Sequence, residues 1–164
     1  MTRHRHDLLR EGLITGVIGA VAVAGWFLIT DLIQGHPLAT PSILGQVILY
    51  GQTAPVTTPV EVGPALSYTL LHIGVFVLFG IGVTELVHLA MTSPLARFGL
   101  MITAVVFELF FFLITYVLFA GTLQLFPWWS VLAANTLALL AMGYYLASRH
   151  RSLGRRFAGE ALGA

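Results

Sequence analysis

Cysteine is absent from the chain, and charged residues are scarce, at 9% of 164 residues. The absence of cysteine excludes disulfides, thiolate metal sites and a cysteine nucleophile. A soluble domain would carry about 25% charged residues, so too few are present here to cover a water-facing surface. Lysine is also absent, and the net charge of +1 gives no sign of a nucleic-acid partner.

Catalytic motifs are lacking as well. The sequence has no nucleophile–base pair with sensible spacing, no glycine-rich phosphate loop after a strand, and no H-E-x-x-H. We therefore expect a protein that is not an enzyme, and the sequence indicates neither catalytic residues nor a bound cofactor.

Long apolar runs dominate what remains. Hydrophobic residues make up 57% of the chain, and the mean hydropathy is +0.89. A helix that crosses a membrane needs about 20 mostly apolar residues. The pattern predicts an all-α membrane protein, a single transmembrane domain over residues 1–164 built as a four-helix bundle. The predicted spans are residues 12–33, 65–90, 98–120 and 128–147.

The arginines predict how these spans are oriented. They precede the first span, lie between the second and third, and follow the fourth, whereas the other two connections contain none. By the positive-inside rule, both termini are cytoplasmic in a multi-pass protein of the bacterial inner membrane. Trp128 and Trp129 fit the outer aromatic belt. The basic residues are Arg3, Arg5, Arg10, Arg97, Arg149, Arg151, Arg155 and Arg156.

The first outer connection, residues 34–63, is long enough to have structure of its own. Thr40 is a candidate N-cap, followed by Pro41 at the first helical position. The apolar residues at 43, 44, 47 and 48 share one helical face. We predict a short helix at the outer interface or tucked against the bundle, followed by an irregular Pro- and Thr-rich stretch.

Small residues recur every four positions along the first span, and glycines occur in the second. Such stripes let helices approach closely in lipid. They predict close packing, either inside this bundle or against another subunit. The residues are Gly12, Gly16, Ala20 and Ala24 in the first span, and Gly74, Gly80 and Gly82 in the second.

Asp31 and His72 have similar heights, about 28 and 24 Å from the inner edge at 1.5 Å per residue. His36 lies just beyond, on a Gly–His–Pro turn. Two histidines and a carboxylate can hold Zn²⁺ or non-haem iron, and Glu61 is a possible fourth ligand. The alternative is that Asp31 and His36 meet water while His72 bonds a neighbouring helix.

Glu108 falls about 15 Å from the inner edge and Asn135 about 20 Å. A carboxylate at mid-bilayer is costly, so Glu108 should face the bundle, where Asn135 can donate to it. This pair serves either as a contact between helices or subunits or in handling an ion or solute. Glu85, His88 and Arg97 mark the inner edge, and Glu85-x-x-His88 is also a partial di-metal motif.

Four segments are spread over most of the chain: "GWFLITDLIQGHPLATPSILG", "LLHIGVFVLFGIGV", "VFELFFF" and "WWSVLAANTLALLAMGYYL". In these segments the sequence resembles small four-span bacterial membrane proteins, a resemblance that implies the same architecture but no activity. We expect an accessory or structural subunit of a larger membrane complex, with lipid and other subunits or its own copies as partners. The alternatives are an ion or solute transporter centred on Glu108, or an outer-face metal-binding protein.

Overall fold

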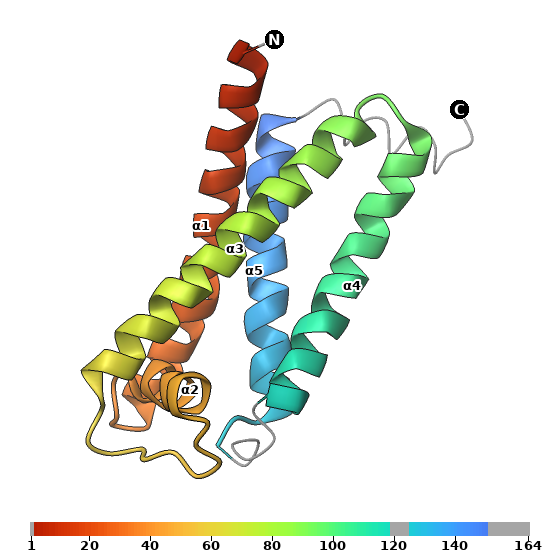
Figure 1. Cartoon of the computed structure of the whole chain (residues 1–164). Helices are drawn as coiled ribbons and strands as arrows, with labels where there is room; N and C mark the ends of the chain where they lie inside the picture. The colour runs from red at the N-terminus through yellow and green to blue at the C-terminus, as the bar shows by residue number, and fades with distance from the viewer. Residues whose placement is uncertain (1, 119–124, 151–164) are drawn as a thin grey trace.

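The computed structural model describes residues 2–118 and 125–150, with the side chains of residues 7–117 and 125–150. Residues 119–124, where the third predicted span ends, lie outside the described residues, as do Arg151, Arg155 and Arg156. The described residues form helices and no strand. The helices are α1 (Thr2–Ile33), α2 (Ala39–Tyr50), α3 (Val62–Ala90), α4 (Pro94–Leu118) and α5 (Trp128–Arg149) (Figure 1).

Helices α1, α3, α4 and α5 are long and apolar enough to cross a membrane, which suggests a membrane protein and confirms the all-helical prediction. The helices overrun the predicted spans at several ends. The largest difference is in α1, which begins at Thr2 rather than near Gly12. Residues 2–11 contain neither proline nor glycine, so nothing in them interrupts the helix.

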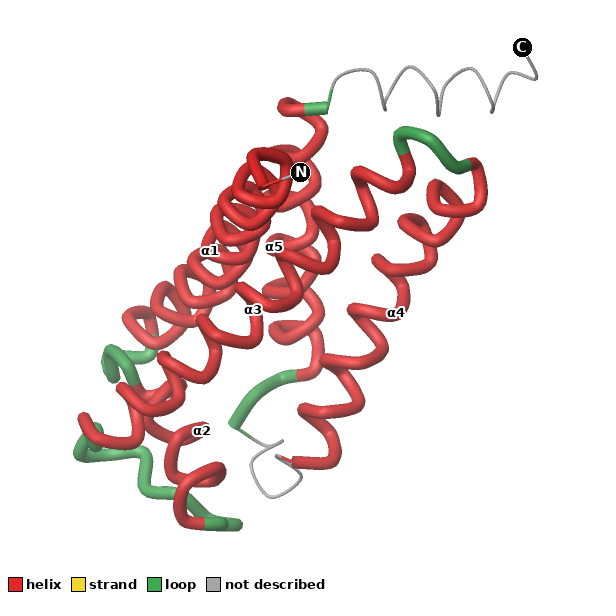
Figure 2. Tube along the Cα trace, turned by 45° about the horizontal axis from the view of Figure 1, so that its top comes forward, coloured by secondary structure: helices red, strands yellow, loops and turns green. Residues whose placement is uncertain are grey.

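Helices α1, α3 and α5 pack together, whereas α4 diverges from them at one edge (Figures 1 and 2). The beginning of α1, the α3–α4 connection and the end of α5 lie at one end of the bundle, which we call the terminal end. Helix α2 lies at the opposite end, which we call the α2 end. Four consecutive membrane-spanning helices would produce this arrangement, with the first helix beginning and the last helix ending at the same end of the bundle.

The crossing of α1 and α3 depends on glycine. A Cβ atom added at Gly12 would lie 2.6 Å from Ile81 Cα, and one added at Gly80 would lie 2.6 Å from Gly16 Cα. Side chains cannot approach backbone so closely, so these positions must be glycine for the two helices to touch. Gly12, Gly16 and Gly80 therefore pack inside the bundle, as one of the two interpretations predicted, whereas a Cβ atom added at Gly74 or Gly82 would meet no other atoms within 4 Å.

Helix α2 packs against α3 and the end of α1, with Ile43 and Leu44 buried beside Phe126. Its close contact with α3 is made by Gly45, whose Cα faces the backbone of Pro64. The structure thus contains the short helix predicted in the first outer connection.

The irregular chain after α2 is held by buried polar side chains rather than by secondary structure. Gln46 Nε2 donates to the Val56 carbonyl at 2.9 Å, and Val56 N–H donates back to Gln46 Oε1 at 2.8 Å. The Glu61 N–H donates to Ser42 Oγ at 2.9 Å. These bonds replace the backbone pairing that an extended, proline-containing segment cannot make with itself.

Candidate functional site

Asp31 is buried at the junction between α1 and α2, with 4% of its surface exposed. Its Oδ2 accepts a hydrogen bond from Thr40 N–H at 2.8 Å, and its Oδ1 accepts one from Thr40 Oγ1 at 2.6 Å. An anion at a helix N-terminus satisfies an otherwise unpaired N–H group and interacts favourably with the helix dipole. Asp31 therefore caps α2, and the expected N-cap, Thr40, lies inside the first turn.

Of the other two residues of the outer metal hypothesis, His36 lines the same pocket as Asp31, whereas His72 packs against the middle of α1. His72 donates through Nε2 to the Ala20 carbonyl of α1 at 3.2 Å, and its ring packs between Tyr68 and Phe76. His36 is exposed on the turn after α1. The structure does not bring Asp31, His36 and His72 together, because Asp31 is committed to α2 and His72 to α1.

In the middle of the bundle, Glu108 on α4 faces α5, as predicted. Thr136 Oγ1 donates to Glu108 Oε1 at 3.0 Å, and the side chain of the expected donor, Asn135, also lies beside the Glu108 carboxyl group. Asn135 also lines a cavity of about 70 Å³, together with His72 and Phe111. The buried atoms Glu108 Oε2 and Asn135 Nδ2 have no hydrogen-bond partner among the described residues.

At the terminal end, Glu11 lies between two histidines. His88 Nε2 is 3.1 Å from Glu11 Oε2, and His150 Nε2 is 2.9 Å from Glu11 Oε1. The two imidazole rings meet edge to face, with centroids 4.9 Å apart. The side chains are 12% (Glu11), 28% (His88) and 18% (His150) exposed, so the cluster is enclosed but reaches solvent.

Each residue of this terminal cluster comes from a different part of the chain. Glu11 lies on α1, His88 lies in the last turn of α3, and His150 directly follows α5, where its N–H donates to the Leu146 carbonyl. One ligand atom from each of the three residues can be chosen so that all lie within 4.8 Å of one another. The cluster therefore joins three helices through one carboxylate.

Of the residues predicted at the inner edge, only His88 belongs to this cluster. Glu85 is exposed, and Arg97 is buried with Nη1 donating to the Ala90 carbonyl at 3.1 Å. Sequence reasoning missed Glu11 and His150 because they flank the apolar runs rather than lie within them. The available signal was their closeness to the span ends, since both residues lie within three positions of a predicted span boundary.

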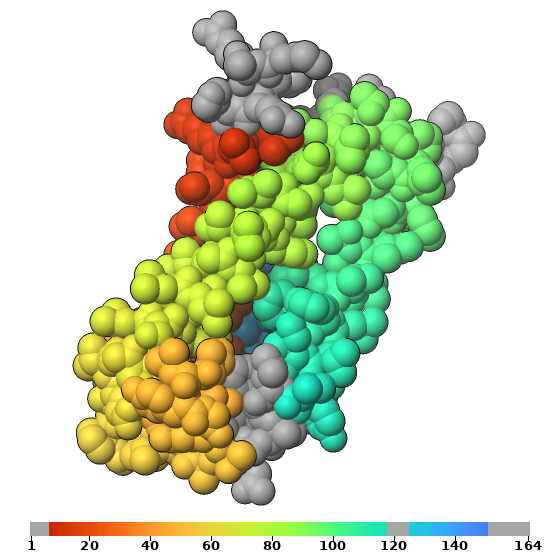
Figure 3. Space-filling model, viewed as in Figure 1, coloured from red at the N-terminus to blue at the C-terminus, as the bar shows by residue number. Residues whose placement is uncertain are grey.

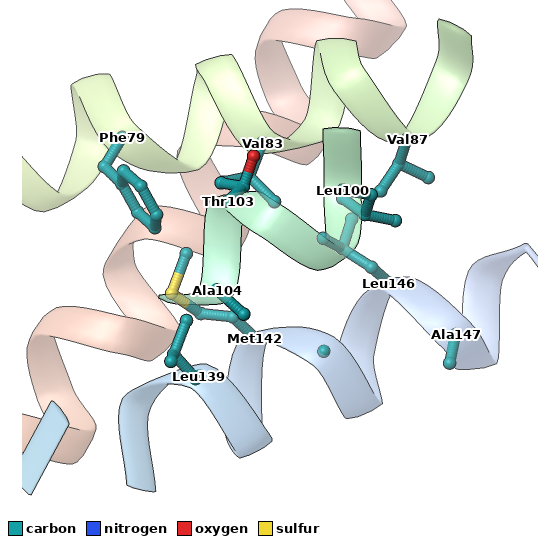
Figure 4. Close-up of a pocket in the computed structure, with 11 residues that line it drawn as sticks. Phe79, Val83, Val87, Leu100, Thr103, Ala104, Leu139, Met142, Leu146 and Ala147 are labelled. Carbon is teal, nitrogen blue, oxygen red and sulfur yellow. The ribbon is translucent and has the colours of Figure 1, made fainter. Parts of the chain in front are cut away.

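An apolar pocket of about 290 Å³ opens between α3, α4 and α5 in the half of the bundle nearer the terminal end (Figure 4). In the space-filling view, a hollow separates α3 from α4 (Figure 3). Thr103 is the one lining residue with a polar side chain, and its hydroxyl already donates to the Gly99 carbonyl at 2.8 Å. The pocket offers hydrocarbon contacts and no free polar group from its lining side chains.

Comparison with known protein families, with curated proteins and with solved structures finds no match for the chain. Function is therefore inferred from the residues of the chain and from their geometry.

Proposed function

We propose that the protein is a non-enzymatic accessory subunit of a larger membrane assembly, which it joins through α4. The observation that carries this proposal is the buried Glu108 Oε2, which lacks a hydrogen-bond partner among the described residues. In hydrocarbon, a carboxyl oxygen without a donor is unfavourable by several kcal/mol, and lipid cannot supply the donor.

Helix α4 is also the least embedded of the four long helices. Only 6% of the most apolar 18-residue stretch of α4 is buried, compared with 22% for the same length of α3 and 33% for α1 and α5. Lipid can cover exposed apolar side chains, but it cannot satisfy Glu108. A partner helix seated on α4 would press α4 onto α5, so that the side chains of Glu108 and Asn135 come close enough for a full hydrogen bond.

The proposed location is the bacterial inner membrane, with the terminal end in the cytoplasm. Arg10, Arg97 and Arg149, which lie in the described part of the chain, belong to the helix ends at the terminal end. The segment between α1 and α3 at the opposite end has no basic side chain apart from His36. This asymmetry supports the cytoplasmic placement of the arginines.

Native mass measurement after extraction in mild detergents tests the subunit proposal. We expect the wild-type protein to have a mass larger than one chain, and Glu108→Leu to release the partner. Glu85→Gln is the matched control, because it neutralises an exposed carboxylate on α3 and should leave the complex intact. A wild-type mass of one chain in every mild detergent would refute the proposal.

A carrier of ions or small solutes is the second candidate, and it depends on the same unpaired Glu108 oxygen. An intramembrane acid is a functional site by default, because its burial is otherwise costly. Reconstitution into liposomes separates the two functions. Ion or solute flux that disappears in Glu108→Gln would favour the carrier, and flux equal to that of empty liposomes would exclude it.

A further inference from the structure

We propose that Glu11, His88 and His150 bind a divalent transition-metal ion at the terminal end of the bundle. This inference does not depend on the proposed subunit function, since it concerns different residues at a different depth. The proposed site has two histidines and one carboxylate, as the sequence-based hypothesis for the outer end had, but it lies at the terminal end.

The ligand types fit such a metal. Two imidazoles and one carboxylate form the set that holds Zn²⁺ or non-haem Fe²⁺ with coordination positions left open. Nitrogen and oxygen ligands of this kind do not favour Cu⁺, which prefers sulfur, and histidine distinguishes the site from one for Mg²⁺ or Ca²⁺.

The distances fit as well. Metal–ligand bonds of about 2.1 Å place neighbouring ligand atoms roughly 3 Å apart when they meet at right angles. His88 Nε2 lies 3.1 Å from Glu11 Oε2, and His150 Nε2 lies 2.9 Å from Glu11 Oε1, so a carboxylate that binds through both oxygens serves both histidines at one ion. Both Nε2 atoms already point toward the carboxylate, so the ion can replace the shared hydrogens with only small side-chain shifts.

Hydrogen bonds of two threonine side chains fix α1 against α3 next to the cluster. Thr15, one turn along α1 from Glu11, donates to the Glu11 carbonyl at 2.8 Å and receives a hydrogen bond from Thr84 of α3 at 3.3 Å. Thr84 lies one turn from His88 on α3, so this pair of threonines fixes the height of Glu11 relative to His88. Ligands on rigid helices hold a metal geometry better than ligands on loops.

Three protein ligands leave at least one coordination position for water or an anion, which distinguishes this site from a closed structural zinc site. A bound ion would cross-link α1, α3 and the end of α5. Binding to the folded state alone then raises thermal stability in proportion to the logarithm of metal concentration.

Calorimetric titration of the purified, metal-free full chain with Zn²⁺ tests the proposal, using a purification tag without histidine. We expect one Zn²⁺ per chain. Glu11→Gln and His150→Asn should each weaken binding by more than the ~10–100-fold that loss of a group supporting a ligand costs. X-ray absorption of the bound zinc should show two imidazole ligands.

Two control variants show whether other histidines bind the ion. His36→Asn removes an exposed histidine at the α2 end, and the double variant His4→Asn/His6→Asn removes two near the N-terminus. Both should bind Zn²⁺ as the wild type does. Helical content by circular dichroism confirms that each variant is folded, and Zn²⁺ should raise the unfolding temperature of the wild type but not of Glu11→Gln.

Three outcomes would overturn the proposal. They are a wild-type chain that binds no Zn²⁺, binding that persists unchanged in both folded cluster variants, and binding that is lost only with His4 and His6. If Glu11→Gln and His150→Asn both fail to fold, the X-ray absorption spectrum of wild-type zinc decides, and a spectrum without two imidazoles would refute the site.

Discussion

Asp31 lies at the C-terminal end of α1, yet it completes the N-terminus of α2. A buried carboxylate with two hydrogen bonds to one residue is costly to remove, because it leaves the Thr40 N–H without a partner. We expect Asp31→Ala to lower the free energy of unfolding by about 1–3 kcal/mol, measured by thermal or denaturant unfolding in detergent.

Thr40→Val provides a graded comparison, because it removes the hydroxyl bond to Asp31 but keeps the N–H bond. Its effect should be smaller than that of Asp31→Ala. Asp7→Ala, at an exposed position of α1, is the neutral control. Equal stability of Asp31→Ala and the wild type would show that the cap contributes nothing.

Sequence reasoning identified the important polar residues but often not their partners. Asn135 and Thr136 are neighbours that point about 100° apart on α5, and both lie beside Glu108, but only Thr136 makes a hydrogen bond of ordinary geometry to it. Height along a helix follows from residue counting, whereas rotation about its axis depends on packing. This is why residue counting placed Asn135 beside Glu108 but did not identify Thr136 as the donor of the 3.0 Å hydrogen bond.

At the scale of elements, the α1–α3 crossing is the contact most sensitive to a single methyl group. Gly80→Ala would place a Cβ 2.6 Å from Gly16 Cα, so the two helices must move apart. We expect destabilisation of about 1–3 kcal/mol, typical of overpacking, in the same unfolding measurement.

Gly82→Ala is the matched control on the same helix, since a Cβ there meets nothing within 4 Å. It should be neutral or slightly stabilising, because alanine is the better helix former. Similar losses in both variants would mean that helix propensity or membrane insertion, rather than the close crossing, determines the result.

Element positions were predictable because apolar run length largely defines a membrane-spanning helix. Helix ends were less predictable: α1 continues through the charged residues before its apolar run, and α2 begins at Ala39, after the left-handed Leu38. Such a cap leaves little trace in sequence, since its hydrogen-bonding side chain comes from Asp31 on another helix.

At the scale of the whole molecule, an even number of long helices places the beginning of α1 and the end of α5 at one end (Figure 1). We predict that a reporter fused after the C-terminus will fluoresce in the cytoplasm, and that one inserted within residues 51–60 will report the outer side. The opposite pair of results would reverse the proposed orientation.

The four-helix architecture followed from composition and from the spacing of apolar runs, but the terminal cluster did not. Glu11 and His88 are 77 residues apart, and Glu11 and His150 are 139 apart. Their contact depends on how α1, α3 and α5 pack side by side. No local sequence pattern predicts this packing.

The wide sequence separation within the terminal cluster also has a consequence for biosynthesis. Chains emerge from the ribosome N-terminus first, so Glu11 precedes His150 by most of the time needed for translation. Glu11 can meet His88 once α3 has entered the membrane, but it can meet His150 only after α5 is in place. Within the terminal cluster, the contact with His150 therefore forms after the contact with His88, and it distinguishes a chain that includes α5 from shorter intermediates.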